Sequence, residues 1–259
     1  MQFEEIAIRH GDVEAKVSPA RGALVSALEV AGKDVLYLDR VSFDDESKNV
    51  RGGIPVLFPH AGKLADGIFL AADTRMGQHG FGRNRQWSIT ERKPWRLRMS
   101  ITPDAESRGI YPYDFVAEQT CTALPTGLEV ELCVVNKGDK ALPVSPGWHP
   151  YFNCPAGRKG DVRGDVPGLH TDQFGNDREF DFGLPAPQNG RACFDVPSLG
   201  RLELSFSPEM RHMQFWSQPG KDFICLEPFT GPNNTINTDR RIDVAPGTAH
   251  TFFMRIEVE

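Results

Sequence analysis

The sequence has no long apolar run, and its longest apolar stretches are only strand-sized. A helix that crosses a bilayer needs ~20 apolar residues in a row, so no transmembrane helix is expected. The amino terminus opens with Glu4 and Glu5 instead of a basic and then apolar leader, which predicts that the chain is not secreted. Five scattered cysteines without a Cys-x-x-Cys pair indicate neither a disulfide framework nor a zinc site. We therefore expect a cytoplasmic protein without a metal ion.

Positive charge is also scarce. Lys and Arg number 29 against 35 Asp and Glu, the formal net charge is −6, and no basic stripe is visible. Proteins that bind nucleic acids neutralise phosphates with clustered Lys and Arg, so this composition excludes nucleic acid as a partner. With membranes excluded as well, we expect a small-molecule partner and a chain that is monomeric or forms a weak homodimer.

Helical patterning is rare. Glycine (25) and proline (20) punctuate the chain, and no long window carries a clean apolar stripe with the helical period. Apolar residues instead recur at every second position, which is typical of half-buried strands. The clearest examples are residues 97–101, 128–134, 202–206 and 253–258.

Turn residues divide the strand patterns into hairpins. Residues 6–9 and 13–17 flank one turn, and residues 23–30 and 35–38 flank another. Residues 153–189 are rich in Gly, Asp, Arg and Pro, so we expect long loops at one end of the sheets. No internal repeat is present. The prediction is an all-β fold with little helix, formed by residues 1–259 as a single-domain β-sandwich of large antiparallel sheets.

Four segments place a titratable side chain in backbone made rigid by Pro or permissive by Gly: residues 51–59 (RGGIPVLFP), 78–83 (QHGFGR), 145–152 (SPGWHPYF) and 226–232 (LEPFTGP). Proton transfer requires such rigid placement of an acid or a base. His149 is a candidate, and Trp148, Tyr151 and Phe152 beside it supply flat faces that could stack on a sugar. Glu227 continues an apolar run, so it lies either at a solvent edge or half-buried, and burial would raise its pKa toward that of a useful base.

Together and in this order, the four segments resemble the galactose mutarotase-like superfamily, which includes the aldose 1-epimerases and hexose-6-phosphate mutarotases. The resemblance runs from about Gly22 to the carboxy terminus. It implies a β-supersandwich with a sugar lying across one concave sheet, and a reaction that uses no metal or organic cofactor. It also implies that His149 is the general acid, that Glu227 is the general base, and that His79 faces the sugar.

Anomer exchange requires the sugar ring to open at C1, with one proton taken from the C1 hydroxyl and one given to the ring oxygen. We expect the carboxylate of Glu227 and the imidazolium of His149 to do this from opposite sides of C1, with a bell-shaped pH profile. In the resemblance, Arg51 and Arg83 match arginines that clamp a 6-phosphate, although each could equally pair with a carboxylate. Lys63 stands where the family often has an arginine that touches sugar hydroxyls. His60 and Asp181 receive no role.

The leading hypothesis is thus an aldose 1-epimerase acting on a hexose or hexose 6-phosphate. The alternative is a non-catalytic carbohydrate-binding or sugar-sensing module, which would have no need of an acid and a base. A glycoside hydrolase or polysaccharide lyase is disfavoured, because hydrolases usually pair two carboxylates and no second motif-borne carboxylate accompanies Glu227.

Overall fold

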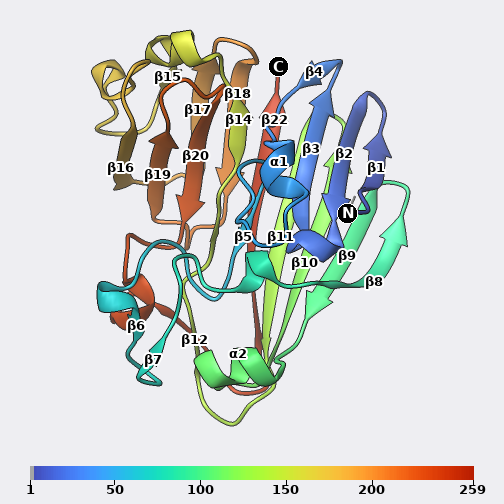
Figure 1. Ribbon diagram of the computed structural model, residues 1–259, viewed down its shortest axis with the longest axis vertical. Helices are drawn as coiled ribbons and strands as arrows, with labels where there is room; N and C mark the ends of the chain where they lie inside the picture. The colour runs from blue at the N-terminus through green and yellow to red at the C-terminus, as the bar shows by residue number, and fades with distance from the viewer. Residues whose placement is uncertain (1–2) are drawn as a thin grey trace.

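The computed structural model describes residues 3–259, which fold almost entirely into antiparallel strands (Figure 1). The two α-helices are short: α1 (Arg40–Phe43) has four residues and α2 (Ala105–Ile110) has six. Within residues 3–259, no helix combines the length and apolarity needed to span a bilayer. The prediction of an all-β fold with little helix is confirmed. The remaining helical turns are of the 3₁₀ type: η1 (Pro19–Arg21), η2 (Ala65–Gly67), η3 (Gly82–Asn84), η4 (Ala156–Asp161), η5 (Thr171–Gln173) and η6 (Thr235–Asn237).

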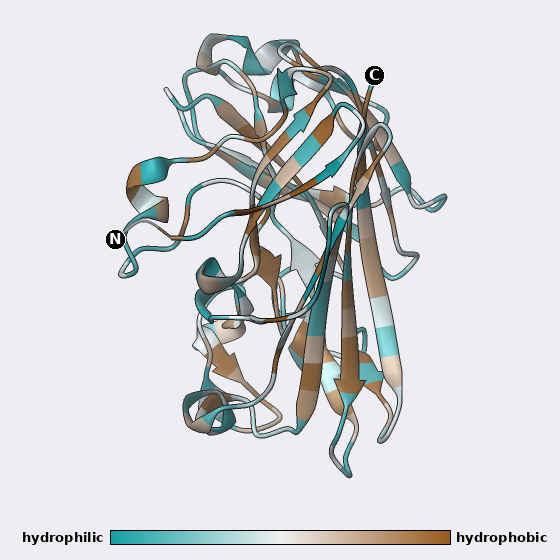
Figure 2. Ribbon diagram, turned by 90° about the vertical axis from the view of Figure 1, so that its right-hand side faces the viewer, coloured by the Kyte–Doolittle hydropathy of each residue, from teal (hydrophilic) through white to brown (hydrophobic). Residues whose placement is uncertain are grey.

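The largest sheet has eight strands and forms one layer of the molecule. The predicted alternation is confirmed along its central strands, where every second residue is buried, and Figure 2 shows the resulting bands of hydrophobic and hydrophilic colour. In order across the sheet, the strands are β15 (Arg163–Gly164), β17 (Arg191–Val196), β18 (Gly200–Phe206), β22 (Ala249–Val258), β11 (Gly127–Asn136), β10 (Phe115–Leu124), β9 (Arg96–Ile101) and β8 (Ser88–Lys93).

Two further sheets cover this layer. The four-stranded sheet contains β1 (Ile6–His10), β2 (Val13–Ser18), β3 (Leu24–Val30) and β4 (Lys33–Asp34). The six-stranded sheet contains β16 (Phe180–Pro185), β19 (His212–Ser217), β20 (Phe223–Phe229), β13 (Gly147–Trp148) and β5 (Val56–Leu57), with β14 (Tyr151–Asn153) also paired to β20. Two small ribbons complete the fold: β12 (Leu142–Val144) with β21 (Ile242–Val244), and β6 (Ile68–Phe69) with β7 (Thr74–Arg75).

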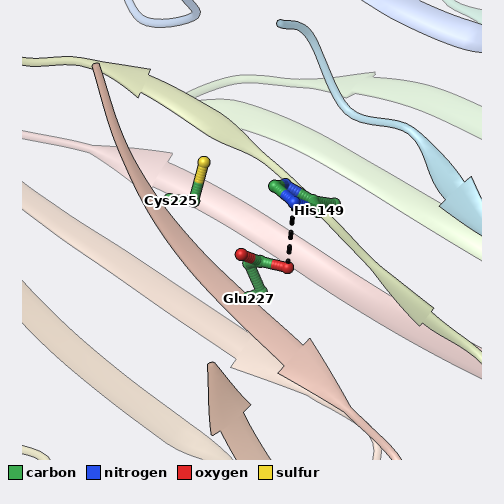
Figure 3. Close-up of side chains that lie close together, drawn as sticks. All are labelled: His149, Cys225 and Glu227. Atoms are coloured by element: carbon green, nitrogen blue, oxygen red, sulfur yellow. Dashed lines mark ion pairs between the residues drawn. The ribbon is translucent and has the colours of Figure 1, made fainter. Parts of the chain in front are cut away.

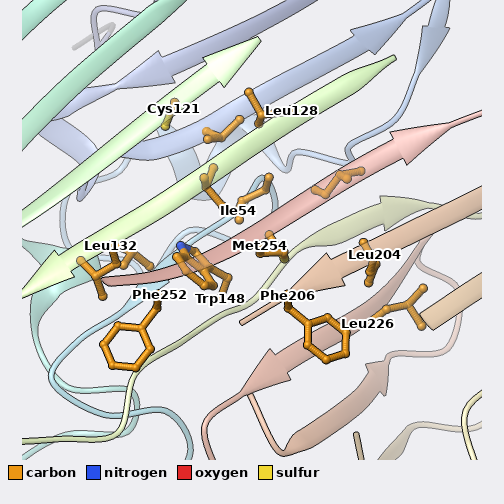
Figure 4. Close-up of a cluster of buried hydrophobic side chains, with 14 of the residues drawn as sticks. Ile54, Cys121, Leu128, Leu132, Trp148, Leu204, Phe206, Leu226, Phe252 and Met254 are labelled. Atoms are coloured by element: carbon orange, nitrogen blue, oxygen red, sulfur yellow. The ribbon is translucent and has the colours of Figure 1, made fainter. Parts of the chain in front are cut away.

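The core fills the space between the layers. Figure 4 shows Trp148 of β13 and Leu226 of β20 among side chains of the eight-stranded sheet such as Phe252 and Met254. All four side chains are almost completely buried. Full burial of one such apolar side chain stabilises a fold by about 1.5–3 kcal/mol. This packing holds the six-stranded sheet rigidly, and the opposite face of that sheet is left to form a pocket.

The second predicted hairpin differs from the structure. The first hairpin is confirmed as β1 and β2, but β4 lies inside the predicted turn, at Lys33–Asp34. Residues 35–38 make isolated bridges instead, from Leu36 to Phe152 and from Leu38 to Gly52. The N–H of Val35 still donates to the carbonyl of Leu28, as in a hairpin, but the N–H of Tyr37 donates to the carbonyl of Tyr151 in β14, which is far away in sequence and therefore invisible to a local hairpin pattern.

The predicted loop region, residues 153–189, is also only partly loop. It contains the short strand β15 and, near its end, the six-residue strand β16, which pairs with β19 at the edge of the six-stranded sheet. Phe180 and Phe182 of β16 pack toward the core, so the period-two pattern is present. Glycine and proline within the strand obscure it.

Candidate active site

A pocket with a volume of about 260 Å³ lies on the face of the six-stranded sheet that is turned away from the core. The strands β16, β19 and β20 form its floor, and loops from distant parts of the chain form its walls. The pocket brings together every residue that the sequence predicted for the site: Arg51, Lys63, His79, Arg83, His149 and Glu227.

Glu227 reaches the pocket because side chains alternate along β20. Ile224 and Leu226 point into the main core, whereas Cys225, Glu227 and Phe229 point the other way. Glu227 is only 1% exposed, and its Oε2 atom is buried without a hydrogen-bond partner among residues 3–259. It is therefore neither an edge residue nor half-buried but fully enclosed at the base of the pocket.

His149 follows β13, and its backbone N–H donates to the carbonyl of Pro55 at 3.1 Å. Its ring stacks on the ring of Tyr151, with centroids 4.7 Å apart and planes 14° apart. The expectation that Trp148 and Phe152 also face the sugar is wrong, because both are buried in the main core. Trp148 and Phe152 both lie on the core face, opposite His149, whereas Tyr151 shares the pocket face with His149.

His149 and Glu227 are in direct contact (Figure 3). The distance from His149 Nε2 to Glu227 Oε2 is 3.4 Å, so the expected arrangement on opposite sides of a sugar-sized gap is wrong. Burial, followed by the charges of Arg83 and Arg51, lowers the pKa of His149 to about 3. Burial, followed by the charge of Asp181, raises the pKa of Glu227 well above its ordinary value. Burial thus disfavours the charged form of each group, so the neutral pair, a protonated carboxyl beside an uncharged imidazole, is favoured over the ion pair.

His79 stands beside this pair, with its ring centroid 5.5 Å from that of His149. Its Nδ1 accepts a hydrogen bond from the N–H of Gly62 at 3.0 Å, so a neutral His79 carries its proton on Nε2. The side-chain amide nitrogen of Gln78 lies 3.0 Å from this Nε2. Burial, followed by the charges of His149 and Arg83, lowers the pKa of His79 well below its ordinary value. His79 is thus a fixed, neutral donor.

Arg51, Lys63 and Arg83 supply positive charge to the pocket. Among residues 3–259, none of the three forms an ion pair with a carboxylate, so the alternative role predicted for Arg51 and Arg83, as partners of carboxylates, is not observed. Arg83 donates from Nη2 to the carbonyl of Gln78 at 3.2 Å, and its Nε is buried without a partner. The guanidinium carbon of Arg51 lies 5.2 Å from the ring centroid of Trp216. These cations leave hydrogen-bonding capacity for an anion.

Asparagine side chains join the wall at Lys63 to the segment around η6. A side-chain oxygen of each asparagine accepts a hydrogen bond from a backbone N–H of residues 63–70. Gly62 is required at this join, because a Cβ there would lie 2.4 Å from Asn233 Oδ1. The bonded pairs are Asn233 with Lys63 (2.8 Å), Asn234 with Ala65 (3.1 Å) and Asn237 with Leu70 (2.9 Å).

The pocket residues that received no role from the sequence include four from one edge: Glu179, Asp181, Gln214 and Trp216. They lie on or beside β16 and β19, the edge of the six-stranded sheet. Gln214 donates to Asp181 Oδ1 at 2.5 Å, and the indole N–H of Trp216 donates to Glu179 Oε1 at 2.9 Å. The polar-apolar alternation of residues 179–184 was the signal in the sequence that could have identified a strand with Glu179 and Asp181 on its polar face. His60, which also received no role, is fully buried and does not line the pocket.

One cluster has donor atoms suited to a metal ion. One atom each from His149, Cys225 and Glu227 lies within 4.8 Å of the other two (Figure 3). Burial raises the pKa of the Cys225 thiol well above its ordinary value, so a divalent ion would displace protons from both the thiol and the carboxyl. Arg51 and Arg83 add positive charge nearby, which opposes a cation. This donor set suits proton transfer better than metal binding.

Comparison with known proteins adds an independent line of argument. A family model described as aldose 1-epimerase matches residues 4–173, a range that includes His149 but ends before Glu227. The Slr1438 protein of Synechocystis has a crystal structure with a TM-score of 0.92 and 27% identity, covering 100% of this chain and 96% of that one. The strand that carries Glu227 is therefore inside the shared fold.

Two curated proteins match part of the sequence. Protein LacX of Lactococcus lactis is 31% identical over 142 residues, which are 52% of this chain and 46% of LacX. An Escherichia coli protein provisionally named a glucose-6-phosphate 1-epimerase is 24% identical over 156 residues, which are 59% of this chain and 49% of that protein. The chain spans about half the length of the curated relatives it matches.

Proposed function

Because this chain belongs to the aldose 1-epimerase family, we propose that it is an enzyme that interconverts the α and β anomers of a hexose or hexose 6-phosphate. The observation that carries this proposal is the 3.4 Å contact between His149 Nε2 and Glu227 Oε2 inside the pocket. The pocket of about 260 Å³ is below the ~300–1,000 Å³ typical of drug-sized ligands, as a single sugar ring requires.

Adjacent placement of the two groups suits the reaction. The C1 hydroxyl oxygen and the ring oxygen are bonded to the same carbon, so the two proton carriers must approach neighbouring atoms. On opening, Glu227 takes the proton of the C1 hydroxyl, His149 gives a proton to the ring oxygen, the bond between C1 and the ring oxygen breaks, and C1 becomes an aldehyde. After rotation about C1–C2, the reverse transfers close the ring on the other face.

The resting protonation state matches the open-chain stage of this cycle. With the proton on Glu227 and His149 neutral, the free site already holds the arrangement that follows ring opening. A cyclic sugar requires the proton on His149 instead, and the 3.4 Å contact provides the path for that shift. The C1 hydroxyl then donates to the carboxylate and the ring oxygen accepts from the imidazolium, which offsets the cost of separating the two charges.

The free cations favour a phosphorylated sugar. Arg51, Arg83 and Lys63 all line the pocket without a carboxylate partner among residues 3–259, and a phosphate dianion would satisfy them with charge-assisted hydrogen bonds. The name of the Escherichia coli relative points to the same substrate class. We therefore propose hexose 6-phosphates as the preferred substrates and neutral hexoses as weaker ones.

NMR exchange spectroscopy on glucose, galactose and glucose 6-phosphate tests the proposal. The protein should accelerate anomer exchange, most strongly for glucose 6-phosphate, and His149→Ala and Glu227→Gln should each abolish the acceleration. Arg51→Ala should weaken the effect on glucose 6-phosphate selectively. Binding of these sugars without accelerated exchange would reject the enzyme and leave the carbohydrate-binding module. Equal effects on phosphorylated and neutral sugars would reject the phosphate preference alone.

A further inference from the structure

The indole of Trp216 lies between a cation and an anion at the rim of the pocket. The guanidinium carbon of Arg51 is 5.2 Å from the centroid of the indole ring. On the ring edge, the indole N–H donates to Glu179 Oε1 at 2.9 Å. The three residues come from separate parts of the sequence, the segment before Gly52, strand β19 and the segment before β16, and all three line the pocket.

Glu179 fixes the orientation of this ring. Trp216 is only 9% exposed and packs on Phe223, with ring centroids 5.2 Å apart, and edge-on against Tyr151 at 5.9 Å. The indole N–H is a donor only, and Glu179 Oε1 is its acceptor. Without that acceptor the N–H would be left unsatisfied at a nearly buried site, so the ring would turn toward water.

Arg51 depends on the ring in turn. Its side chain is exposed and forms no hydrogen bond or ion pair within residues 3–259, so the face of Trp216 is its one described partner. Indole faces attract guanidinium groups through the ring quadrupole. A guanidinium held by its face keeps the N–H groups on its edge free to grip a planar or tetrahedral anion.

We propose that Glu179 is a positioning residue for anion recognition: by orienting Trp216, it holds Arg51 at the pocket rim and so sets the preference for phosphorylated over neutral sugars. This inference rests on the proposed function for its choice of substrate. Glu179 touches neither the reacting atoms nor the phosphate, and it acts through the ring.

Simple electrostatics predicts that removal of Glu179 has the opposite effect on anion binding. Glu179 is an anion in the wall of the pocket, so its removal by itself would strengthen the binding of another anion. The proposed positioning role predicts that removal of Glu179 weakens anion binding, because Arg51 loses the oriented ring that it contacts. Glu179→Leu removes both the charge and the acceptor, whereas Glu179→Gln removes the charge but keeps an oxygen that accepts from the indole N–H. The two variants therefore separate the two explanations.

Isothermal titration calorimetry with glucose 6-phosphate, inorganic phosphate and glucose provides the measurement. Glu179→Leu should weaken glucose 6-phosphate and phosphate binding by about 5-fold, a typical value for one cation–π contact, and change glucose affinity by less than about twofold. Glu179→Gln should restore the wild-type affinities or exceed them. Tighter anion binding by Glu179→Leu would overturn the proposal, and so would a wild-type protein that binds neither phosphate ligand.

A double-mutant cycle between Glu179 and Trp216 measures their coupling in phosphate affinity, which a merely structural role of Glu179 would not produce. Trp216→Phe keeps an aromatic face but has no N–H, so in that background Glu179→Leu should no longer weaken phosphate binding and should leave only the small electrostatic gain from removing its charge. Additive losses would overturn the proposal. Because these are binding measurements, they remain informative if anomer exchange is not accelerated, and a failure of the proposed enzyme would be seen separately in the NMR assay.

Discussion

The two faces of strand β20 are buried to the same extent but have different chemistry. On one face, Ile224 and Leu226 pack into the main core between the layers. On the other, Cys225 and Glu227 are equally enclosed, yet a carboxyl oxygen of Glu227 has no hydrogen-bond partner among residues 3–259. Burial therefore does not distinguish core from site in this sheet. The distinguishing property is the presence of a buried polar atom that has no hydrogen-bond partner.

This difference assigns a separate energetic role to each face. An unsatisfied buried polar group costs about 1–3 kcal/mol. The apolar face more than offsets that cost, because each fully buried apolar side chain contributes about 1.5–3 kcal/mol. The core face of β20 thus stabilises the strand on which the pocket face holds a buried, unsatisfied carboxyl.

The largest expected effect comes from a substitution on the pocket face of β20, which should remove the activity. Glu227→Gln removes the proton carrier but preserves shape, so anomer exchange should fall by about 10²- to 10⁴-fold while the protein stays folded. NMR exchange spectroscopy measures the rate, and circular dichroism checks the fold. Near wild-type exchange in this variant would show that the polar face is not the catalytic one.

The matched change on the core face should act on stability instead. Leu226→Ala, one residue away, should lower the free energy of unfolding by about 2–5 kcal/mol through lost packing and the cavity it leaves. Exchange per folded molecule should be preserved. Urea denaturation measures the first effect and the NMR assay the second. A large loss of exchange in the folded Leu226→Ala protein would mean that the two faces are not independent.

The pH dependence of stability sharpens the comparison further. The pKa of Glu227 is raised by burial, so between its ordinary value of 4.5 and its folded value the folded chain binds more protons than the unfolded chain. Stability is therefore lost as the pH rises through this window, by up to about 1.4 kcal/mol per pH unit. Glu227→Gln should be more stable than wild type at pH 8 and nearly equal to it at pH 4. If the stabilities of wild type and Glu227→Gln, measured by urea titration, differed by the same amount at every pH, the raised pKa of Glu227 would be contradicted.

The pH at which kcat/KM falls on the acid side should also be lower than the sequence suggests. The sequence suggests a bell-shaped profile with His149 and Glu227 charged together, but the pKa of His149 is lowered to about 3 by burial and by the charges of Arg83 and Arg51. The one-proton state of the pair therefore persists down to that pH, and kcat/KM should fall only near it, severalfold per pH unit. An acid limb centred near pH 6 would show that the imidazole titrates as if it were solvated.

The smallest expected effect concerns a pocket residue outside β20. Gln78→Leu removes the amide that contacts His79 Nε2 at 3.0 Å, which should lower kcat/KM by about 2- to 10-fold, the equivalent of one hydrogen bond. Gln86→Leu is the matched control, because Gln86 is exposed and does not line the pocket. Equal effects of the two substitutions would indicate a general loss of stability rather than a role at His79.

Local patterns were sufficient for much of the fold. The alternation in residues 128–134 and 253–258 predicts β11 and β22 correctly, because each has one face on the core and one toward solvent. Strand β16 was missed because Gly183 and Pro185 resemble turn residues, and only its pairing with β19 makes it a strand. The single domain over residues 1–259 stays a prediction, which one cooperative unfolding transition would support.

The site was predictable as a set of residues but not as a chemical state. The motifs brought His149 and Glu227 to attention, and the structure places both in one pocket. Their contact and the position of their shared proton depend on burial by distant strands, which no motif encodes. For the same reason the sequence did not identify Glu179 and Trp216, whose hydrogen bond exists only because β16 and β19 are neighbours.

The asparagine bonds between residues 63–70 and the segment around η6 have a consequence for how ligands enter. They make these two walls a single mechanical unit that cannot swing apart without breaking several hydrogen bonds at once. A sugar that enters or leaves the pocket must therefore pass a wall whose two segments, distant in sequence, keep their spacing.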